Sequence, residues 1–305
     1  MIKIRKIAHY MVSVACLLVA ITACKKEIDA VIPGNGEALK INYIANSDVL
    51  RHYKIGGIGI FVDTIPHRNT GNFPFFDLTS VPQKLEYPNF FSTVSGLLYA
   101  NYLSGQHRFK YNYMIPDSLS GSFGSKPDKM LIDTALILEK DAGSLLYLID
   151  GPIARENDTP TFKIMVIPAN RALKLDSTQV AITISHQSPD TENISCSRIT
   201  SNGELSRENL PQDLAYGQST PYLIFAVKDA SNGILGLRIY SKSNGKELIN
   251  TGIPANGGHA YALAISGFQN EQERLLPLKL NSDHSVLYGK ATIFPNLRAS
   301  TRQIW

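Results

Sequence analysis

Apolar and polar side chains alternate along many short segments of this chain. Residues 39–45 read Leu-Lys-Ile-Asn-Tyr-Ile-Ala, and residues 106–113 read Gln-His-Arg-Phe-Lys-Tyr-Asn-Tyr. Alternation with a period of two places every second side chain on the same face of a β-strand. Beyond the first residues, no segment shows the longer period of an extended amphipathic helix, so the pattern predicts an all-β protein.

Short strands follow one another along the chain, with Gly, Pro and Asn turns between them. The strongest turn signal is Asn244-Gly245, which lies between the segments 235–240 and 246–249. It predicts a tight hairpin, because Asn and Gly both accept positive φ. Regularly spaced short strands of this kind are typical of antiparallel β-sandwiches.

The first residues of the chain follow a different pattern. A basic head within residues 1–6 precedes an apolar run, residues 7–20, and then small residues and a cysteine. This is the order of a secretory signal, and the run is shorter than the roughly 20 residues of a membrane-spanning helix. Residues 21–24, Ile-Thr-Ala-Cys, resemble a bacterial lipoprotein box, which implies cleavage between Ala23 and Cys24 and acylation of Cys24. The alternatives are an ordinary signal peptide and a membrane anchor.

The residue after Cys24 bears on where the protein is located. In Gram-negative lipoprotein sorting, which this segment resembles, a residue other than Asp at that position favours the outer membrane, and here it is Lys25. We therefore expect the chain to be anchored in the cell outer membrane through acylated Cys24, facing either the periplasm or the cell surface.

Charge and cysteine content limit the chemistry of the mature chain. Residues 1–23 contain three basic residues and no acidic residue, so their removal leaves 27 Lys and Arg against 26 Asp and Glu. A nearly neutral chain argues against a nucleic-acid partner, which requires a basic face. Cys196 is the one cysteine left free, so no intramolecular disulfide can form. No His flanks it, and we interpret it as a small strand residue rather than a reactive thiol.

Breaks in the strand pattern divide the chain into parts. Pro and Gly residues interrupt it after the lipoprotein box, and a charged and polar stretch bracketed by Pro152 and Pro160 interrupts it near the middle. The predicted parts are a signal peptide at 1–23, a lipidated cysteine with a flexible tether at 24–38, a first β-sandwich domain at 39–152, a linker at 153–160, a second β-sandwich domain at 161–268 and a C-terminal tail at 269–305.

The two halves of the chain contain an internal repeat. Each has a strand, a glycine turn and a Tyr-bearing apolar strand that ends in Gly. The matched segments are 131–134 with 248–251, 141–151 with 256–267, and 58–63 with 180–185. Two copies indicate a tandem rather than a solenoid, which needs at least three.

The repeated segments carry a family resemblance. Strand 39–45 with Asn46-Ser47, strand 58–63 and the Gly-turn-Tyr strand resemble the tandem bacterial lipoproteins of the domain of unknown function 4397 family, over about residues 39–268. The resemblance implies two tandem immunoglobulin-like antiparallel β-sandwich domains after a cleaved lipoprotein signal peptide. It supplies no catalytic residues. The insertion at 73–91 departs from the family pattern and leaves the strand count of the first domain open.

The motifs of the common enzyme classes are absent from the sequence. It has no HExxH, no Gly-x-Ser-x-Gly, no phosphate loop and no paired CxxC. Residues 217–221 begin like a nucleophile elbow but lack its final Gly, so we predict a polar turn. Asp190, Glu192 and Asn193 lack the spacing of a calcium loop, and we predict a solvated loop. We expect no metal, no cofactor and no enzymatic activity.

Aromatic residues are concentrated in one stretch, since 11 of the chain's 27 lie between Phe73 and Tyr113. Exposed aromatic faces can stack on sugar rings or dock a protein. Phe109, Tyr111 and Tyr113 share one face of a strand, which favours core packing for those three. The candidate ligand contacts precede them and are Phe73, Phe75, Phe76, Tyr87, Phe90 and Phe91. The alternative is that these side chains also fill the core.

Together these features favour a cell-envelope lipoprotein that acts as a non-catalytic binding or adhesion module for a glycan or a protein. Its expected partners are the lipid bilayer, through acylated Cys24, and a glycan or an envelope protein. One alternative is a structural accessory subunit of an outer-membrane complex. Another is a hydrolase whose site is assembled from residues that are distant in the sequence.

Overall fold

The computed structural model describes most of the chain from residue 39 onward. The described residues are 39–53, 55–63, 65–66, 76–77, 86–87, 100–102, 104–116, 125–139, 142–152, 160–170, 173–283 and 285–305. All of them belong to one compact unit, Gly36–Trp305. The signal segment, Cys24 and the predicted tether lie outside the described residues.

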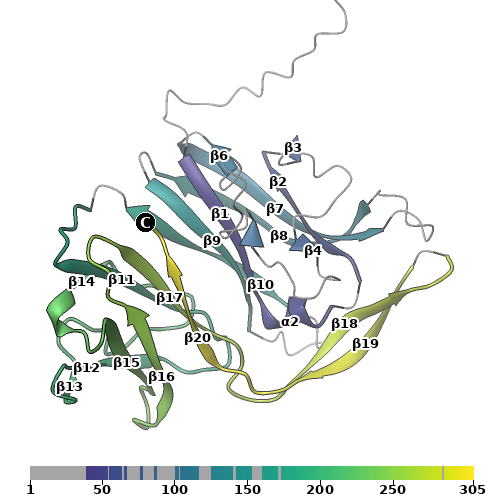
Figure 1. Cartoon of the computed structure of the whole chain (residues 1–305). Helices are drawn as coiled ribbons and strands as arrows, with labels where there is room; N and C mark the ends of the chain where they lie inside the picture. The colour runs from purple at the N-terminus through teal and green to yellow at the C-terminus, as the bar shows by residue number, and fades with distance from the viewer. Residues whose placement is uncertain are drawn as a thin grey trace, which may run out of the picture. The chain divides into compact units, whose positions relative to one another are not determined.

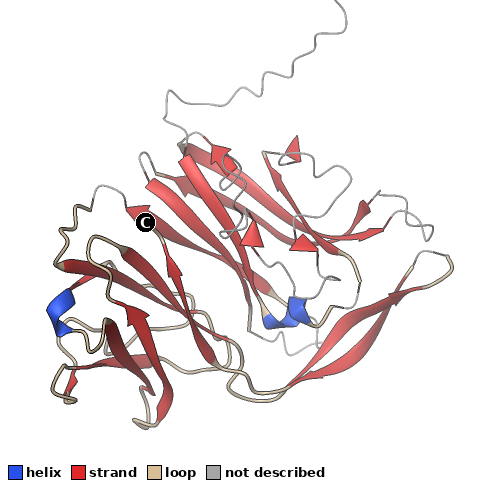
Figure 2. Ribbon diagram, in the orientation of Figure 1, coloured by secondary structure: helices blue, strands red, loops and turns tan. Residues whose placement is uncertain are grey.

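Strands dominate the described part of the chain, which confirms the all-β prediction (Figures 1 and 2). Two short helical turns accompany them, α2 (Asp48–Arg51) and the 3₁₀ turn η1 (Val227–Asp229). The side chain of Ser47 caps α2 by accepting a hydrogen bond from the N–H of Leu50, a common role for Ser at this position.

Two sheets form the first half of the described body. The first inner sheet has the order β10 (Phe162–Asn170), β9 (Ala142–Asp150), β1 (Leu39–Asn46) and β5 (Glu86–Tyr87), with β6 (Ala100–Tyr102) also paired to β1. The first outer sheet has the order β3 (Ile65–Pro66), β2 (Gly57–Val62), β7 (Gly105–Pro116) and β8 (Ser125–Leu138), with β4 (Phe76–Asp77) also paired to β2.

Two further sheets and a hairpin form the second half. The second inner sheet has the order β14 (Leu223–Ala226), β11 (Gln179–His186), β17 (Ala260–Ser266) and β20 (Arg298–Gln303). The second outer sheet has the order β13 (Leu205–Ser206), β12 (Ile194–Ile199), β15 (Ile234–Ser241) and β16 (Glu247–Pro254). The hairpin consists of β18 (Gln272–Leu280) and β19 (Val286–Ile293).

The two halves repeat one strand order. In the inner sheets, β10, β9 and β1 correspond to β20, β17 and β11. In the outer sheets, β2, β7 and β8 correspond to β12, β15 and β16. The hairpin of β18 and β19 lies between β17 and β20, whereas residues 151–161 alone separate β9 from β10. The repeat expected from the sequence is therefore seen in the pairing of the strands.

One feature of each inner sheet differs from the antiparallel arrangement that we predicted. Strand β1 runs parallel to β9, and β11 runs parallel to β17, while the other pairs in these sheets are antiparallel. Parallel neighbours need a long crossover connection, and here the strands of the outer sheet supply it. Periodicity reports which face of a strand is buried but not the direction of its neighbour, so the sequence pattern could not reveal this pair.

The strand order also corrects two details of the sequence repeat. The segment 180–185 was matched with 58–63, yet β11 takes the place of β1 and not that of β2. Tyr147 and Tyr261 were matched as well, but Tyr147 faces the contact between the inner sheets and Tyr261 faces the second sandwich core. When two strands are matched one residue out of register, the paired side chains lie on opposite faces of their sheets.

Three hydrophobic cores hold the four sheets together as layers. One core fills the first sandwich, with Tyr43 from β1 and Tyr111 from β7, and another fills the second, with Leu263 from β17 and Ile239 from β15. The third core lies between the two inner sheets. There the bulky residues of the first inner sheet meet a row of alanines, Ala181, Ala260, Ala262 and Ala264, from the second inner sheet. Small side chains let one sheet come close to the larger side chains of the other.

The predicted second domain begins with residues 161–170, and the structure shows where that segment pairs. Strand β10 is hydrogen-bonded along its length to β9, so it belongs to the first inner sheet. Its side chains are divided between two cores: Ile164 and Val166 pack toward the first sandwich, and Met165 and Ile167 toward the third core. Most of the predicted linker lies outside the described residues, and a division of the chain into independent domains stays a prediction.

The predicted C-terminal tail is built into the fold. Leu276 and Ile293 of the hairpin are fully buried in the core of the first sandwich. Strand β20 completes the second inner sheet by pairing with β17. Trp305 packs against Tyr222, with 5.4 Å between the ring centroids. Strands β18, β19 and β20 all lie within this predicted tail.

Candidate binding groove

Of the six aromatic residues predicted to contact a ligand, two lie among the described residues. Phe76 lies in β4 opposite Ile58, and Tyr87 lies in β5 opposite Tyr43. The other four predicted contacts, Phe73, Phe75, Phe90 and Phe91, lie outside the described residues. Their role as ligand contacts stays a prediction. By contrast, the three aromatic residues that we assigned to the core, Phe109, Tyr111 and Tyr113, are each 1% exposed or less, which confirms that assignment.

The lipid attachment site also stays a prediction, because Ala23 and Cys24 lie outside the described residues. In the part of the chain that the structure describes, no helix is long and apolar enough to cross a membrane.

The cysteine of the mature chain is a strand residue, as we expected, and lies in β12. Cys196 faces the core of the second sandwich and is 0% exposed. Burial raises the pKa of its thiol to about 12. A thiol that stays protonated at neutral pH is a poor nucleophile, so Cys196 is a packing residue.

The loop at 190–193 is solvated at Glu192 and Asn193, as we predicted, but Asp190 is held by the protein. The Asp190 carboxylate accepts hydrogen bonds from the backbone N–H groups of Gln269 (2.9 Å) and Asn270 (2.8 Å) and from the side-chain amide of Gln272 (3.0 Å). Asp190 thus joins the loop after β11 to the loop before β18. A carboxylate whose oxygens are engaged by N–H donors is not arranged as a calcium ligand. No group of three or more His, Cys, Asp and Glu that could hold a metal occurs among the described residues.

The segment that begins like a nucleophile elbow is a polar turn, as predicted. Gly217 has a φ of +76°, and its N–H donates to the carbonyl of His186 over 2.7 Å. The hydroxyl of the preceding Tyr216 donates to the carbonyl of Asp150 over 2.6 Å. This turn therefore connects the two sandwiches.

A polar groove of about 420 Å³ lies on the second outer sheet, on the face turned away from the core. Strand β12 explains how it forms. Ile194 and Cys196 point into the core, and the alternation turns Ser195 and Ser197 to the other face. Tyr240 of β15 is directly opposite Ser195 in the strand register, so it joins the serines on that face. The groove is lined by Ser195, Ser197, Leu205, Arg207, Gln212, Tyr240, Ser241, Lys242 and Gly245.

One side of the groove is held by the segment that follows β13. The side-chain amide of Gln212 donates to the carbonyls of Cys196 (3.0 Å) and Leu210 (3.1 Å). The N–H of Cys196 in turn donates to the carbonyl of Pro211 over 2.8 Å. These bonds fix the segment 210–212 against β12, and a preorganised wall lowers the cost of ordering the site when a ligand binds.

The hairpin between β15 and β16 supplies further lining residues. The hairpin that Asn244-Gly245 predicted is confirmed, but its turn is longer than expected: Gly245, with a φ of +68°, is the one of the two with positive φ, and its N–H reaches back to the carbonyl of Ser241. The longer turn includes Lys242, whose N–H donates to the carbonyl of Asn193 over 2.8 Å.

Charges on the second outer sheet fall into two groups. Arg238, on the same face as Tyr240, pairs with Glu247 over 3.2 Å. Arg207 and Lys242 line the groove and are exposed, and no ion pair is found for either among the described residues. The groove lining includes no Asp, Glu or His, so its own charge is positive.

Sequence reasoning missed this groove. The Ile-Ser-Cys-Ser alternation at 194–197 was a visible signal, since it places two hydroxyls on one strand face. Tyr240 joins them through a pairing that spans more than forty residues, which no local pattern predicts.

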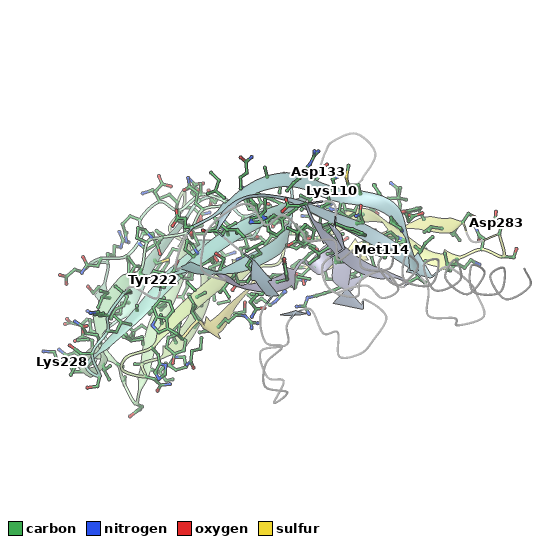
Figure 3. The ribbon with its side chains drawn as sticks, turned by 90° about the horizontal axis from the view of Figure 1, so that it is seen from above. Lys110, Met114, Asp133, Tyr222, Lys228 and Asp283 are labelled. Atoms are coloured by element: carbon green, nitrogen blue, oxygen red, sulfur yellow. The ribbon has the colours of Figure 1, made fainter. Side chains whose placement is uncertain are left out.

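The exposed face of the first outer sheet offers a contrast. Lys110 and Asp133 are cross-strand neighbours in β7 and β8, and Figure 3 shows them close together. Asp133 also accepts two hydrogen bonds from the guanidinium of Arg108, at 2.6 and 2.8 Å. The acid on this face is therefore already matched by basic side chains.

No protein-family model matches this chain, and no curated protein matches it. Among solved structures, a candidate cell adhesion protein from Bacteroides fragilis aligns over 84% of this chain and 98% of its own, with 12% identity and a TM-score of 0.17. A second candidate cell adhesion protein, from Bacteroides ovatus, aligns over 85% and 98%, with 10% identity and a TM-score of 0.18. Scores this low establish no common fold.

Proposed function

We propose that this chain is a non-catalytic binding module of the cell envelope, anchored in the outer membrane through acylated Cys24, that binds a glycan or a protein. The observation that carries the proposal is the polar groove on the second outer sheet. Its volume falls within the range of about 300–1,000 Å³ that is typical of small-molecule sites.

The chemistry of the lining supports binding rather than catalysis. Ser195 and Ser197 supply hydroxyls, but a serine nucleophile needs an adjacent general base. The lining includes no His, Asp or Glu that could act as one. The Glu192 carboxylate beside the groove accepts a hydrogen bond from Ser241, and no His lines the groove next to that pair. Hydroxyl, amide and guanidinium groups around one tyrosine form hydrogen bonds and a stacking surface, which suits recognition.

The binding proposal is tested by thermal unfolding of the mature protein against a panel of polysaccharides. A ligand at 100 times its dissociation constant stabilises by about 2.7 kcal/mol, which raises Tm by roughly 5 °C. We expect Tyr240→Ala to abolish the rise and Lys110→Ala, on the other outer sheet, to leave it unchanged. If simultaneous replacement of Phe75, Phe90 and Phe91 by Ala abolishes the rise instead, the contact is the aromatic segment.

A flat response to every polysaccharide would reject the glycan part of the proposal. Crosslinking on whole cells then decides between a protein-binding module and the accessory-subunit alternative, because a subunit returns one partner in fixed stoichiometry. The anchor is tested separately: Cys24→Ala removes palmitate labelling if the lipoprotein box is used, and retained labelling would contradict it.

A further inference from the structure

We propose that the ligand of this groove is an anionic glycan, a polysaccharide segment whose carboxylates pair with Arg207 and Lys242. The inference deepens the proposed function and rests on it, because it names the ligand class of the same groove. Three features of the described residues lead to it.

The first feature is unneutralised positive charge. Arg198 of β12 pairs with Asp229 (2.7 Å), and Arg238 of β15 pairs with Glu247 (3.2 Å). Arg207 and Lys242 have no such partner in the part of the chain that the structure describes, and both line the groove. Guanidinium and ammonium groups bind carboxylates by charge-assisted hydrogen bonds. Arg207 and Lys242 can therefore pair with carboxylates of a ligand in the groove.

The second feature is the kind of neutral group beside those charges. Ser195 and Tyr240 present hydroxyls, which both donate and accept hydrogen bonds, as sugar hydroxyls do. Ser197 lies deeper in the lining and is 2% exposed. The ring of Tyr240 adds a flat apolar face.

The third feature separates a glycan from an acidic peptide. Leu205 is the one aliphatic side chain of the lining. One common mode of peptide recognition places alternate side chains in pockets and pairs the peptide backbone with a free strand edge. This groove lies across the paired strands β12 and β15 and not along such an edge, so its polar floor favours a sugar chain.

The acidic residue Glu192 lies beside the groove and allows a further prediction. The Glu192 carboxylate accepts a hydrogen bond from the hydroxyl of Ser241, which belongs to the lining. Its negative charge opposes an anionic ligand, so Glu192→Gln, which keeps a hydrogen-bond acceptor, tightens binding if the ligand is acidic.

The test compares polygalacturonate with its methyl ester, which keeps the sugar ring and removes the charge. Calorimetric titration of the full-length lipoprotein in detergent measures both. We expect about tenfold tighter binding of the acid form, weakening as salt is added. The double variant Arg207→Gln with Lys242→Gln loses about that factor. The charge-matched control Lys228→Gln with Lys279→Gln, at exposed sites outside the lining, keeps wild-type affinity (Figure 3 labels Lys228).

Each contrary result identifies what fails. Equal affinity for the acid and the ester overturns the anionic assignment and leaves the binding function standing. Equal losses in the two double variants overturn the groove as the site, because they indicate attraction to overall charge. Equal affinity for polyglutamate overturns the glycan assignment in favour of an acidic peptide. Binding of none of these polymers, together with a flat polysaccharide panel, overturns the inference and the glycan function together.

Discussion

Asp150 shows how one buried carboxyl couples folding to pH. It lies at the end of β9 and is 3% exposed. Its oxygens accept hydrogen bonds from the hydroxyl of Ser47 and from the N–H groups of Asp48 (2.7 Å) and Val49 (3.3 Å). Burial raises the pKa of Asp150, and the charge of Asp48 adds to the rise. The three hydrogen bonds oppose both effects, and the resulting pKa is about 7.

A raised pKa means that the folded state holds this proton more tightly than the unfolded state does. The stability that Asp150 contributes is therefore full below about pH 4 and is lost as the pH rises toward 7. The loss is on the order of 4 kcal/mol. Asp150→Asn keeps the shape and cannot titrate, so its urea unfolding curves should lack this part of the pH dependence. If the free energy of unfolding changes equally in wild type and variant between pH 4 and pH 7.5, the assignment is contradicted.

Residue-level predictions from the sequence succeeded where one strand decides the outcome. The alternation in β7 correctly buried Phe109 and Tyr111, and that in β12 is consistent with the buried Cys196. The residue-level predictions failed where the hydrogen-bond partner comes from a segment that is distant in the sequence. Asp190 looked solvated because its donors, Gln269 and Asn270, are some eighty residues away.

At the scale of elements, the hairpin of β18 and β19 makes the least expected contact. Leu276 is 0% exposed within the core of the first sandwich. Leu276→Ala should cost about 2–5 kcal/mol, the usual range for a buried Leu. Leu287→Ala on β19 is the control, because Leu287 is 41% exposed, and it should change stability by no more than about 0.5 kcal/mol. If urea unfolding shows that Leu276→Ala changes stability as little as Leu287→Ala does, the hairpin is not docked in this core.

The elements themselves were largely predictable, and their neighbours were not. Alternation predicted strands at 39–45 and 106–113, and both are present, as β1 and β7. The parallel pairing of β1 with β9 joins segments about a hundred residues apart. Such pairings depend on the whole arrangement of sheets, and a local pattern contains no information about them.

At the scale of the whole described body, the inner and outer sheets differ in how many of their faces are buried. The inner sheets are covered on both faces, by a sandwich core on one and by the third core on the other. The outer sheets each keep one face free of these cores. On the first, Arg108 and Lys110 surround Asp133; on the second, the groove keeps Arg207 and Lys242 unpaired within the described residues. Recognition is thus expected on the second outer sheet.

Hydrogen–deuterium exchange of the full chain, with and without polygalacturonate, tests that claim most directly, because it reports every segment in one experiment. The account predicts ligand-dependent protection in residues 195–197, 207–212 and 240–245, with the first outer sheet unchanged. Protection confined to residues 73–91 would move the site to the aromatic segment. Protection in neither region, at a concentration where calorimetry detects binding, would contradict both assignments.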